Sequence, residues 1–302
     1  MSRLMLLDSA SLYFRAFFGV PDTMQAPDGT VINAVRGMVD FVATLAEQYH
    51  PTGIVACWDD DWRPQWRVDL IDTYKTQRLD DSGAESDTTG GLLGPQVPLI
   101  AETMTLLGIP VVGAAEAEAD DVIGALAAQA DCPVDVVTGD RDLFQVVDDR
   151  RKVRVLYTAR GVAKHDVVDA GWLREKYGVG PEQYVDFSVM RGDSSDGLPG
   201  VAGIGEKTAA VLLAEFGDLD GIVAAAHDDA SSIKPRVRAN LLSSGAYMAA
   251  AREVVTVRTY IVPPTDYVLE PLTEDRQTAF RAFGDTWGLG GSVDRVLDAL
   301  SS

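Results

Sequence analysis

The sequence predicts an α/β fold, with a doubly wound, mostly parallel sheet followed by a helical module. Through the first half of the chain, short apolar, β-branched runs alternate with amphipathic helical segments. That alternation is typical of parallel strands covered by helices on both faces. From about residue 162 onward the pattern becomes helical. We therefore expect residues 1–160 to form the sheet domain, and residues 161–302 to form a helical module with a C-terminal tail.

The first elements are indicated by apolar runs and by the residues that end them. Residues 4–8 and 54–58 are apolar runs of strand length. The first ends at Asp8 and the second at Trp58. Between them, residues 11–18 and 33–49 have the apolar spacing of helices and are separated by a turn region rich in Pro, Asp and Gly. The second strand leads into a short helix at residues 63–71.

The remaining elements follow in the same way. A helix at 95–107 stops at Gly108, and residues 109–112 form a short strand. A helix at 117–129 starts with acidic residues, which the helix dipole favours. The other expected elements are strands at 134–138 and 153–156, a short helix at 142–147, and helices at 167–177, 181–190, 207–216 and, after Pro263 and Pro264, 293–300.

The charge of the chain restricts its partners. The formal net charge of −20 argues against a uniformly basic, nucleic-acid-binding surface. The charge is uneven, however, because residues 160–260 hold 11 Lys or Arg against 14 Asp or Glu. Nucleic acid is therefore not excluded as a partner of that part. Two cysteines give no disulfide framework and no run is long enough for a membrane helix, so we expect a cytoplasmic protein without a membrane partner.

Acidic residues occur where the fold would bring them together. Asp8, Asp59 and Asp140 each follow a predicted strand, and the carboxyl ends of parallel strands line one crevice. A further set interleaves with them: Glu118, Asp120, Asp121, Asp142, Asp193 and Asp196. Any single one could be a helix cap or a solvated turn residue. Together, without counter-charge, they would be costly to desolvate unless a cation lies among them.

The residue types indicate which metal this site would hold. Carboxylate oxygens without histidine suit Mg²⁺ or Mn²⁺, and the three histidines are scattered along the chain. Two such ions, about 3.5–4 Å apart, stabilise the attacking and leaving oxygens of an in-line displacement at phosphorus. The acids by themselves therefore predict hydrolysis of phosphodiesters.

A glycine-rich motif precedes the helix at 207–216. It is not an ATP-binding loop, because Glu206 separates the last glycine from the lysine and no strand precedes it. Its backbone N–H groups and helix N-terminus could instead hold one backbone phosphate. A plain helical hairpin with packing glycines remains the alternative. The candidate residues are Gly200, Gly203, Gly205, Lys207 and Thr208.

A third motif lies between the second strand and an acidic loop. Tyr74 stands near Lys75 and Arg78, a combination that could stack a base and neutralise a phosphate, although it could also be a surface helix end. The following residues 79–97 contain no Lys or Arg and include a Gly-Gly pair. We expect this segment to be a mobile loop.

These motifs together resemble one family. Glu118-Ala-Asp-Asp121, Thr138-Gly-Asp-Arg-Asp-Leu-Phe-Gln145 and the segment from Gly192 to Thr208, in this order, are similar to the bacterial flap endonuclease and 5′–3′ exonuclease family, which includes the N-terminal nuclease domain of DNA polymerase I. The resemblance covers residues 3–260. It implies a PIN-like core with an arch or loop at about 74–97, a helix-three-turn-helix module for duplex DNA, two or three divalent ions, and K⁺ at the Gly200–Gly205 hairpin.

The resemblance also assigns roles to residues. It implies one metal group of Asp8, Asp59, Glu118 and Asp120, and a second of Asp121, Asp140, Asp142, Asp193 and Asp196. Lys75 and Arg78 match the basic pair that contacts the scissile phosphate, and Tyr74 matches the neighbouring aromatic. The chain departs from the family at Gly197, where Asn is usual, and in the acidic arch. Since no polymerase domain follows Ser302, we expect a stand-alone nuclease.

The function implied is that of a metal-dependent, structure-specific 5′ nuclease, acting as flap endonuclease and 5′–3′ exonuclease in DNA replication and repair. Its expected substrate is branched or nicked DNA with a 5′ flap. We expect a monomer that works beside a DNA polymerase and a ligase. Two alternatives remain: a catalytically weak DNA-junction binding protein, and a PIN-type ribonuclease acting on RNA. The complete set of acids argues against the first, and the Gly200–Lys207 hairpin argues against the second.

Overall fold

A six-stranded sheet forms the centre of the molecule. The computed structural model describes residues 2–80, 83, 86–262 and 267–301. The sheet has the strand order β3-β2-β1-β4-β5-β6. Its strands are β1 (Leu4–Asp8), β2 (Gly53–Cys57), β3 (Val111–Val112), β4 (Val134–Thr138), β5 (Val153–Tyr157) and β6 (Asp166–Val168). Neighbouring strands run parallel, except that β6 is antiparallel to β5.

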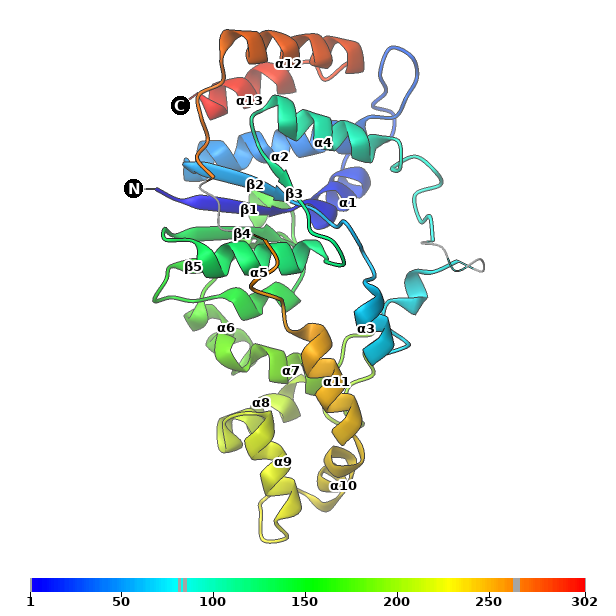
Figure 1. Cartoon of the computed structure of the whole chain (residues 1–302), viewed down its shortest axis with the longest axis vertical. Coiled ribbons are helices and arrows are strands. Elements are labelled where there is room, and N and C mark those ends of the chain that lie inside the picture. Colours follow the sequence, from blue (N-terminus) through cyan, green and yellow to red (C-terminus); the bar gives the residue numbers. More distant parts are fainter. Residues whose placement is uncertain (1, 81–82, 84–85, 263–266, 302) are drawn as a thin grey trace.

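Helices cover both faces of this sheet, so the predicted doubly wound fold is confirmed (Figure 1). One face carries α1 (Ser9–Gly19), α2 (Asn33–Tyr49), α4 (Gln96–Leu106), α12 (Glu274–Trp287) and α13 (Ser292–Leu300). The other face carries α5 (Ala119–Gln129), the short helix η2 (Asp142–Val146) and α6 (Ala170–Tyr177). Along β1 the side chains alternate between the two cores: Leu6 packs in the same core as α5, and Met5 in the same core as α2.

The strand order places a crevice at the centre of the sheet. The chain proceeds outward from β1 to β2 and β3, then returns to the other side of β1 to form β4. Strand order therefore reverses between β1 and β4, and ligands bind outside the carboxyl ends of the strands at such a point. Asp8 ends β1 and Asp140 follows β4 by two residues, so both lie at this crevice.

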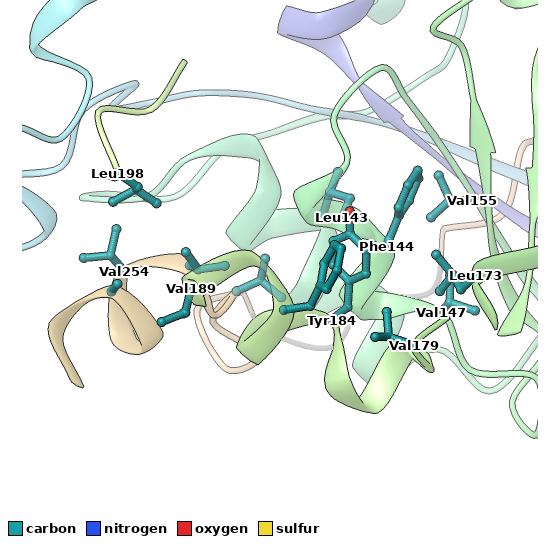
Figure 2. Packing of buried hydrophobic residues seen from close by; sticks show 14 of the residues in the cluster. Leu143, Phe144, Val147, Val155, Leu173, Val179, Tyr184, Val189, Leu198 and Val254 are labelled. Atoms are coloured by element: carbon teal, nitrogen blue, oxygen red, sulfur yellow. The ribbon is translucent and has the colours of Figure 1, made fainter. Parts of the chain in front are cut away.

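The helical module extends from the lower side of the sheet (Figure 1). It contains α7 (Tyr184–Arg191), α8 (Glu206–Phe216), α9 (Leu219–His227), α10 (Pro235–Ser243) and α11 (Gly245–Val255). Helix α11 returns along the module and packs on α7 and on α3 (Gln65–Leu70). Helix α3 follows β2 in the chain and so precedes the helical module. Figure 2 shows the shared core, in which Phe144, Tyr184, Val189 and Val254 form one buried cluster. The module and the sheet domain are therefore joined by a continuous hydrophobic core.

The structure contains the helices α9, α10, α11 and α12, which the sequence did not single out, and it differs from the expected elements at residues 166–169. Residues 166–168 form the edge strand β6, where the sequence predicted the start of a helix. The helix α6 begins only at Ala170, because Asp169 is extended and caps it by accepting from the Trp172 N–H. The β-branched pair Val167–Val168 favours the strand, which pairs with β5. The division into domains at residue 160 stays a prediction, and Pro263–Pro264 lies outside the described residues.

No helix in the described part of the chain is long and apolar enough to span a membrane.

Candidate active site

Asp8 lies at the carboxyl end of β1 and is buried. It caps α1 by accepting from the Ser11 N–H at 3.2 Å, and its second oxygen accepts from the Thr138 hydroxyl at 2.5 Å. Burial raises the pKa of Asp8 to about 7, in spite of these hydrogen bonds, and the neighbouring carboxylates Asp59 and Asp140 add to the rise. The protein alone therefore does not compensate the ionised form of Asp8.

Thr138 connects the two central strands at the crevice. Its hydroxyl donates to Asp8 and accepts from the Asp140 N–H at 2.8 Å. The aspartates that follow β1 and β4 are thus held by one buried side chain. Thr138 was not among the predicted site residues, although it stands at the start of the Thr-Gly-Asp motif.

Asp59 and Asp120 complete the part of the crevice around Asp8. Asp59 accepts from the Ala119 N–H at 2.6 Å, which connects the loop after β2 to the start of α5. Burial raises the pKa of Asp59. Burial, followed by the charges of Asp140 and Asp8, raises the pKa of Asp120 well above its ordinary value. The structure therefore brings these predicted ligands together as mutually repelling carboxylates.

Asp142 extends the group of carboxylates on the other side of Asp140. Burial, together with the charges of Asp140, Asp196 and Asp193, raises its pKa well above the ordinary value. One of its carboxylate oxygens is buried and has no hydrogen-bond partner among the described residues. A buried oxygen without a partner is costly, and a bound cation would satisfy it.

Asp193 and Asp196 belong to the loop between α7 and α8. Burial opposes ionisation of Asp193, but hydrogen bonds from Ser195, together with Arg191 at 3.6 Å and Arg141 at 3.8 Å, hold its pKa below the ordinary value. Burial raises the pKa of Asp196 to about 6, while Lys75 opposes this rise. Asp193 is thus compensated by the protein, and Asp196 only in part.

Glu118 is held by three donors. One carboxylate oxygen accepts from the Tyr74 hydroxyl at 2.7 Å and from the Arg67 guanidinium at 3.0 Å, and the other pairs with the Lys75 ammonium. Glu118 and Asp121 also form a reciprocal capping box at the start of α5. The orientation of Glu118 is therefore fixed before any ligand binds.

Asp121 does not join the other carboxylates, which corrects its expected place in the second metal group. It is fully buried and pairs with Arg67 at 2.9 Å and with the Arg258 backbone N–H at 2.9 Å. Glu118 and Asp121 lie on one face at the start of α5, because the Arg67 guanidinium contacts both of them. That face turns toward Arg67, so Asp121 is a counter-ion for two arginines and positions Glu118.

The basic pair lies directly beside the acids. Lys75 is buried and occupies the left-handed region at φ +51°. Arg78 donates to an Asp196 oxygen at 2.6 Å. Tyr74, by contrast, is buried with its hydroxyl on Glu118. The expected stacking of a base on Tyr74 does not fit this position, because a ring in the core is inaccessible; its role here is to position Glu118.

The glycine-rich hairpin divides into a packed part and an open part. Gly200 lies at φ +71° and its N–H donates to the Tyr247 hydroxyl at 2.9 Å, so this amide does not fit the expected phosphate contact. Gly203 and Lys207 are exposed. Gly205 is the N-cap of α8. Because glycine has no side chain, it makes no capping hydrogen bond to the free N–H groups at the start of this helix. The start of α8, where Lys207 and Thr208 stand, is therefore the accessible part.

Three arginines lie among the carboxylates of the crevice and were not among the predicted site residues. Arg67 is buried between Glu118 and Asp121, and Arg191 is buried beside Asp193 and Glu206. Arg141 pairs with the same two acids as Arg191. Its position between Asp140 and Asp142 was a sequence signal for such a role. Arg67 gave no signal, because one arginine in a short helix is common.

The donor set fits divalent cations, although it does not yet enclose one. Within the described residues, no three acidic, histidine or cysteine side chains are arranged to hold a single ion. The carboxylates repel one another, and some are turned toward Lys75, Arg78 and Arg191. Oxygen donors that are desolvated and under-compensated are the ligands that hard divalent cations prefer.

The chain matches known proteins over nearly its whole length. Residues 3–178 match the family description "5'-3' exonuclease, N-terminal resolvase-like domain", and residues 179–275 match "5'-3' exonuclease, C-terminal SAM fold". The chain is 52% identical to a 5'-3' exonuclease of Streptomyces coelicolor, covering 99% of this chain and 100% of that one. It is 36% identical to DNA polymerase I of Mycobacterium bovis, covering 99% of this chain and 32% of that protein.

Its fold is also found in a solved structure. The chain superposes with a TM-score of 0.67 on the bacteriophage T5 D15 flap endonuclease crystallised with DNA and metal ions, at 19% identity, covering 99% of this chain and 100% of that one. At this identity the likeness shows the fold.

Proposed function

The chain belongs to the 5'-3' exonuclease family, and from that premise we propose that the crevice at the ends of β1 and β4 is its catalytic centre. The protein is a structure-specific 5′ nuclease, a hydrolase with 5′–3′ exonuclease and flap endonuclease activity that acts on DNA in replication and repair. The observation that carries the assignment is the convergence of under-compensated carboxylates on the crevice, with one Asp142 oxygen unpartnered.

Two groups of carboxylates hold divalent ions, Mg²⁺ or Mn²⁺. The first group is Asp8, Asp59, Glu118 and Asp120, and the second is Asp140, Asp142, Asp193 and Asp196. When bound, the ions neutralise the carboxylates and supply the Lewis acidity that phosphodiester hydrolysis uses. The grouping is supported by the mutual pKa effects of these acids and by the oxygen-only donor set.

Lys75 and Arg78 orient the scissile phosphate and compensate the charge that develops on its oxygens. Both cations lie at the edge of the carboxylate group, Lys75 on Glu118 and Arg78 on Asp196. Lys75 is buried and therefore already desolvated, so it stabilises developing charge more strongly than a cation in water, whereas Arg78 is exposed.

The helical module grips the duplex while the sheet domain performs the chemistry. The exposed Lys207 and the half-buried Thr208 at the start of α8 contact a backbone phosphate, aided by the free N–H groups of that helix. A K⁺ ion between the carbonyls of the Gly200–Gly205 hairpin and the same phosphate would strengthen the grip. The substrate is branched or nicked DNA with a short 5′ flap.

The protein works as a monomer and in the cytoplasm, where chromosomal DNA lies. Removal of a 5′ strand leaves a gap or a nick, so a DNA polymerase must fill the gap and a ligase must seal it. The likeness to the nuclease part of DNA polymerase I supports this placement in the reaction sequence.

Asp140→Asn tests the assignment. The substitution keeps the side-chain shape but removes a ligand charge, so cleavage of a nicked 5′-flap duplex should fall by at least about 100-fold, while the circular dichroism spectrum stays that of the wild-type fold. Asp131→Asn, at an exposed turn far from the crevice, is the control and should cleave as wild type does. Faster cleavage of a matched RNA would favour the ribonuclease alternative, and tight binding without cleavage by wild type would favour the junction-binding alternative.

A further inference from the structure

Two segments from distant parts of the chain dock on one another beside the carboxylates. We call residues 73–78 the arch base and residues 193–198 the acid loop. The Lys75 N–H donates to the Asp196 carbonyl at 3.0 Å, and the Thr73 hydroxyl donates to the Gly197 carbonyl at 2.8 Å. The Gln77 side-chain amide donates to the Ser195 carbonyl. These bonds come in addition to the ion pair between Arg78 and Asp196.

Gly197 allows this close approach. It occupies the left-handed region at φ +71°, and a Cβ atom built on it would lie 2.0 Å from the Thr73 carbonyl oxygen and 2.9 Å from its carbon. Real Cβ atoms do not approach backbone atoms this closely, so any other residue would push the arch base away from the acid loop. The departure from the usual Asn at this position thus has a structural consequence.

Docking also holds Lys75 in an unfavourable backbone conformation. A non-glycine residue rarely adopts the left-handed region, so surrounding contacts must maintain it. The N–H of Lys75 is bonded to the acid loop, its ammonium to Glu118 and the Trp62 carbonyl, and its carbonyl accepts from the Arg78 N–H. Lys75 and Arg78 are therefore placed by docking of the arch base.

We propose that Gly197 is a positioning residue: because it has no side chain, the arch base can dock on the acid loop before DNA binds. Lys75 and Arg78 are then set in place by the protein itself and do not depend on a 5′ strand passing through the arch. This inference rests on the proposed function for the roles of the two cations. It fits the acidic arch, which has no cation in residues 79–97 with which to hold such a strand.

Gly197→Ala and Gly197→Asn test the docking. Both add a Cβ atom at the contact with Thr73, and Asn tolerates left-handed backbone, so Asn separates the contact from backbone strain. Gly290→Ala is the matched control, because Gly290 is also left-handed at φ +57° but has open space around the added atom. In DNA-free protein, amide hydrogen exchange at Lys75 should become at least about tenfold faster in both Gly197 variants and remain unchanged in the control.

Cleavage kinetics supply the second measurement. Single-turnover cleavage of a nicked duplex should fall by about 10- to 100-fold in the Gly197 variants, with the dissociation constant for that DNA changed less than about twofold. Exchange at Lys75 and cleavage both at wild-type level in Gly197→Asn would overturn the proposal. So would a loss of DNA affinity with unchanged exchange. If wild type cleaves no DNA, the proposed function fails, whereas the exchange measurement still decides whether docking exists.

A second variant keeps the test usable if the Gly197 variants do not fold. Thr73→Val removes the hydrogen bond to the Gly197 carbonyl without adding bulk at the contact. It should accelerate exchange at Lys75 and lower the single-turnover rate by about threefold or more, because one hydrogen bond between the two segments is lost. Unchanged exchange and rate in this variant would also contradict the proposal.

Discussion

Asp8 illustrates how a single carboxylate in the crevice depends on a ligand. It is buried at the end of a central strand and, among the described residues, receives two hydrogen bonds, from Ser11 and Thr138. These bonds do not offset its desolvation, because its pKa still rises to about 7. In a chain without metal, ionisation of Asp8 therefore opposes folding.

The stability of the metal-free protein should depend on pH accordingly. The pKa of Asp8 rises from an ordinary 3.8 to about 7, and burial likewise raises that of Asp196 to about 6. As the pH rises above about 4, these two carboxyl groups ionise in the unfolded chain before they ionise in the folded chain. The stability that the metal-free protein has below about pH 4 is therefore lost as the pH rises through about 7. The melting temperature in a chelator should fall between about pH 5 and pH 8.

Divalent cation and one substitution are the controls for this pH effect. Millimolar Mg²⁺ should raise the melting temperature most at the upper end of the pH range, because it binds the ionised folded form. Asp8→Asn should flatten the pH dependence in the chelator. A melting temperature that rises steadily with pH in wild type would contradict the assignment.

Lys75 and Lys207 should separate turnover from affinity. Lys75 is buried beside Glu118, and Lys207 is exposed at the start of α8. Lys207→Ala should weaken DNA binding and lower its salt slope by about one, since one phosphate contact is lost. Lys75→Ala should lower single-turnover cleavage with little change in affinity. The reverse result, with affinity lost only in Lys75→Ala, would exchange the two roles.

At the scale of elements, the start of α5 is held by an ion-pair network that also reaches the helical module. Arg67 on α3 pairs with Glu118 and Asp121 and donates to the Val254 carbonyl of α11 at 3.1 Å. Arg258, beyond α11, pairs with Asp121 as well. One buried guanidinium thus joins three helices around a predicted metal ligand.

Arg67→Met should destabilise the protein strongly. Met fills similar space but leaves the charges of Glu118 and Asp121 buried with fewer partners, so we expect a loss of about 3–5 kcal/mol in the free energy of unfolding. Urea titration followed by circular dichroism measures it. Arg174→Met is the control, because the ion pair of Arg174 with Glu182 is exposed and should contribute less than about 1 kcal/mol. Equal losses of unfolding free energy in the two variants would show that the buried ion-pair network contributes no more to stability than an exposed ion pair.

At the scale of the whole molecule, the proposed active site lies between two parts that share one core. The sheet supplies Asp8, Asp59 and Asp140, and the loop entering the helical module supplies Asp193 and Asp196. The acidic arch, residues 79–97, follows the arch base along the chain. Its predicted mobility falls partly on residues 81–82 and 84–85, which lie outside the described residues, and it stays a prediction.

Deletion of residues 80–89 tests what the arch contributes. The segment has acids and no Lys or Arg, so it should repel phosphate and hold a long 5′ strand weakly. We expect cleavage of nicks and short flaps to remain within about threefold of wild type, and long-flap cleavage to change no more than that. Cleavage assays on the three substrates decide it. A selective loss of long-flap cleavage would show that the arch does clamp flaps.

The sequence by itself determined the α/β class, most of the strands and helices, and the identity of the eight acids that converge on the crevice. Apolar runs, their period and their stops are local properties, so they survive without tertiary contacts. Asp8, Asp59 and Asp140 were identifiable because carboxyl ends of parallel strands must meet along one edge.

Only the tertiary structure decided which of these residues face the crevice and which are used in packing. Asp121 and Tyr74 stand beside true crevice residues in sequence, yet both are buried against Arg67 or Glu118. The arch base and the acid loop meet across more than a hundred residues, and Gly197 permits it because a Cβ atom would strike Thr73. Such contacts depend on where distant segments lie, and no local pattern encodes that.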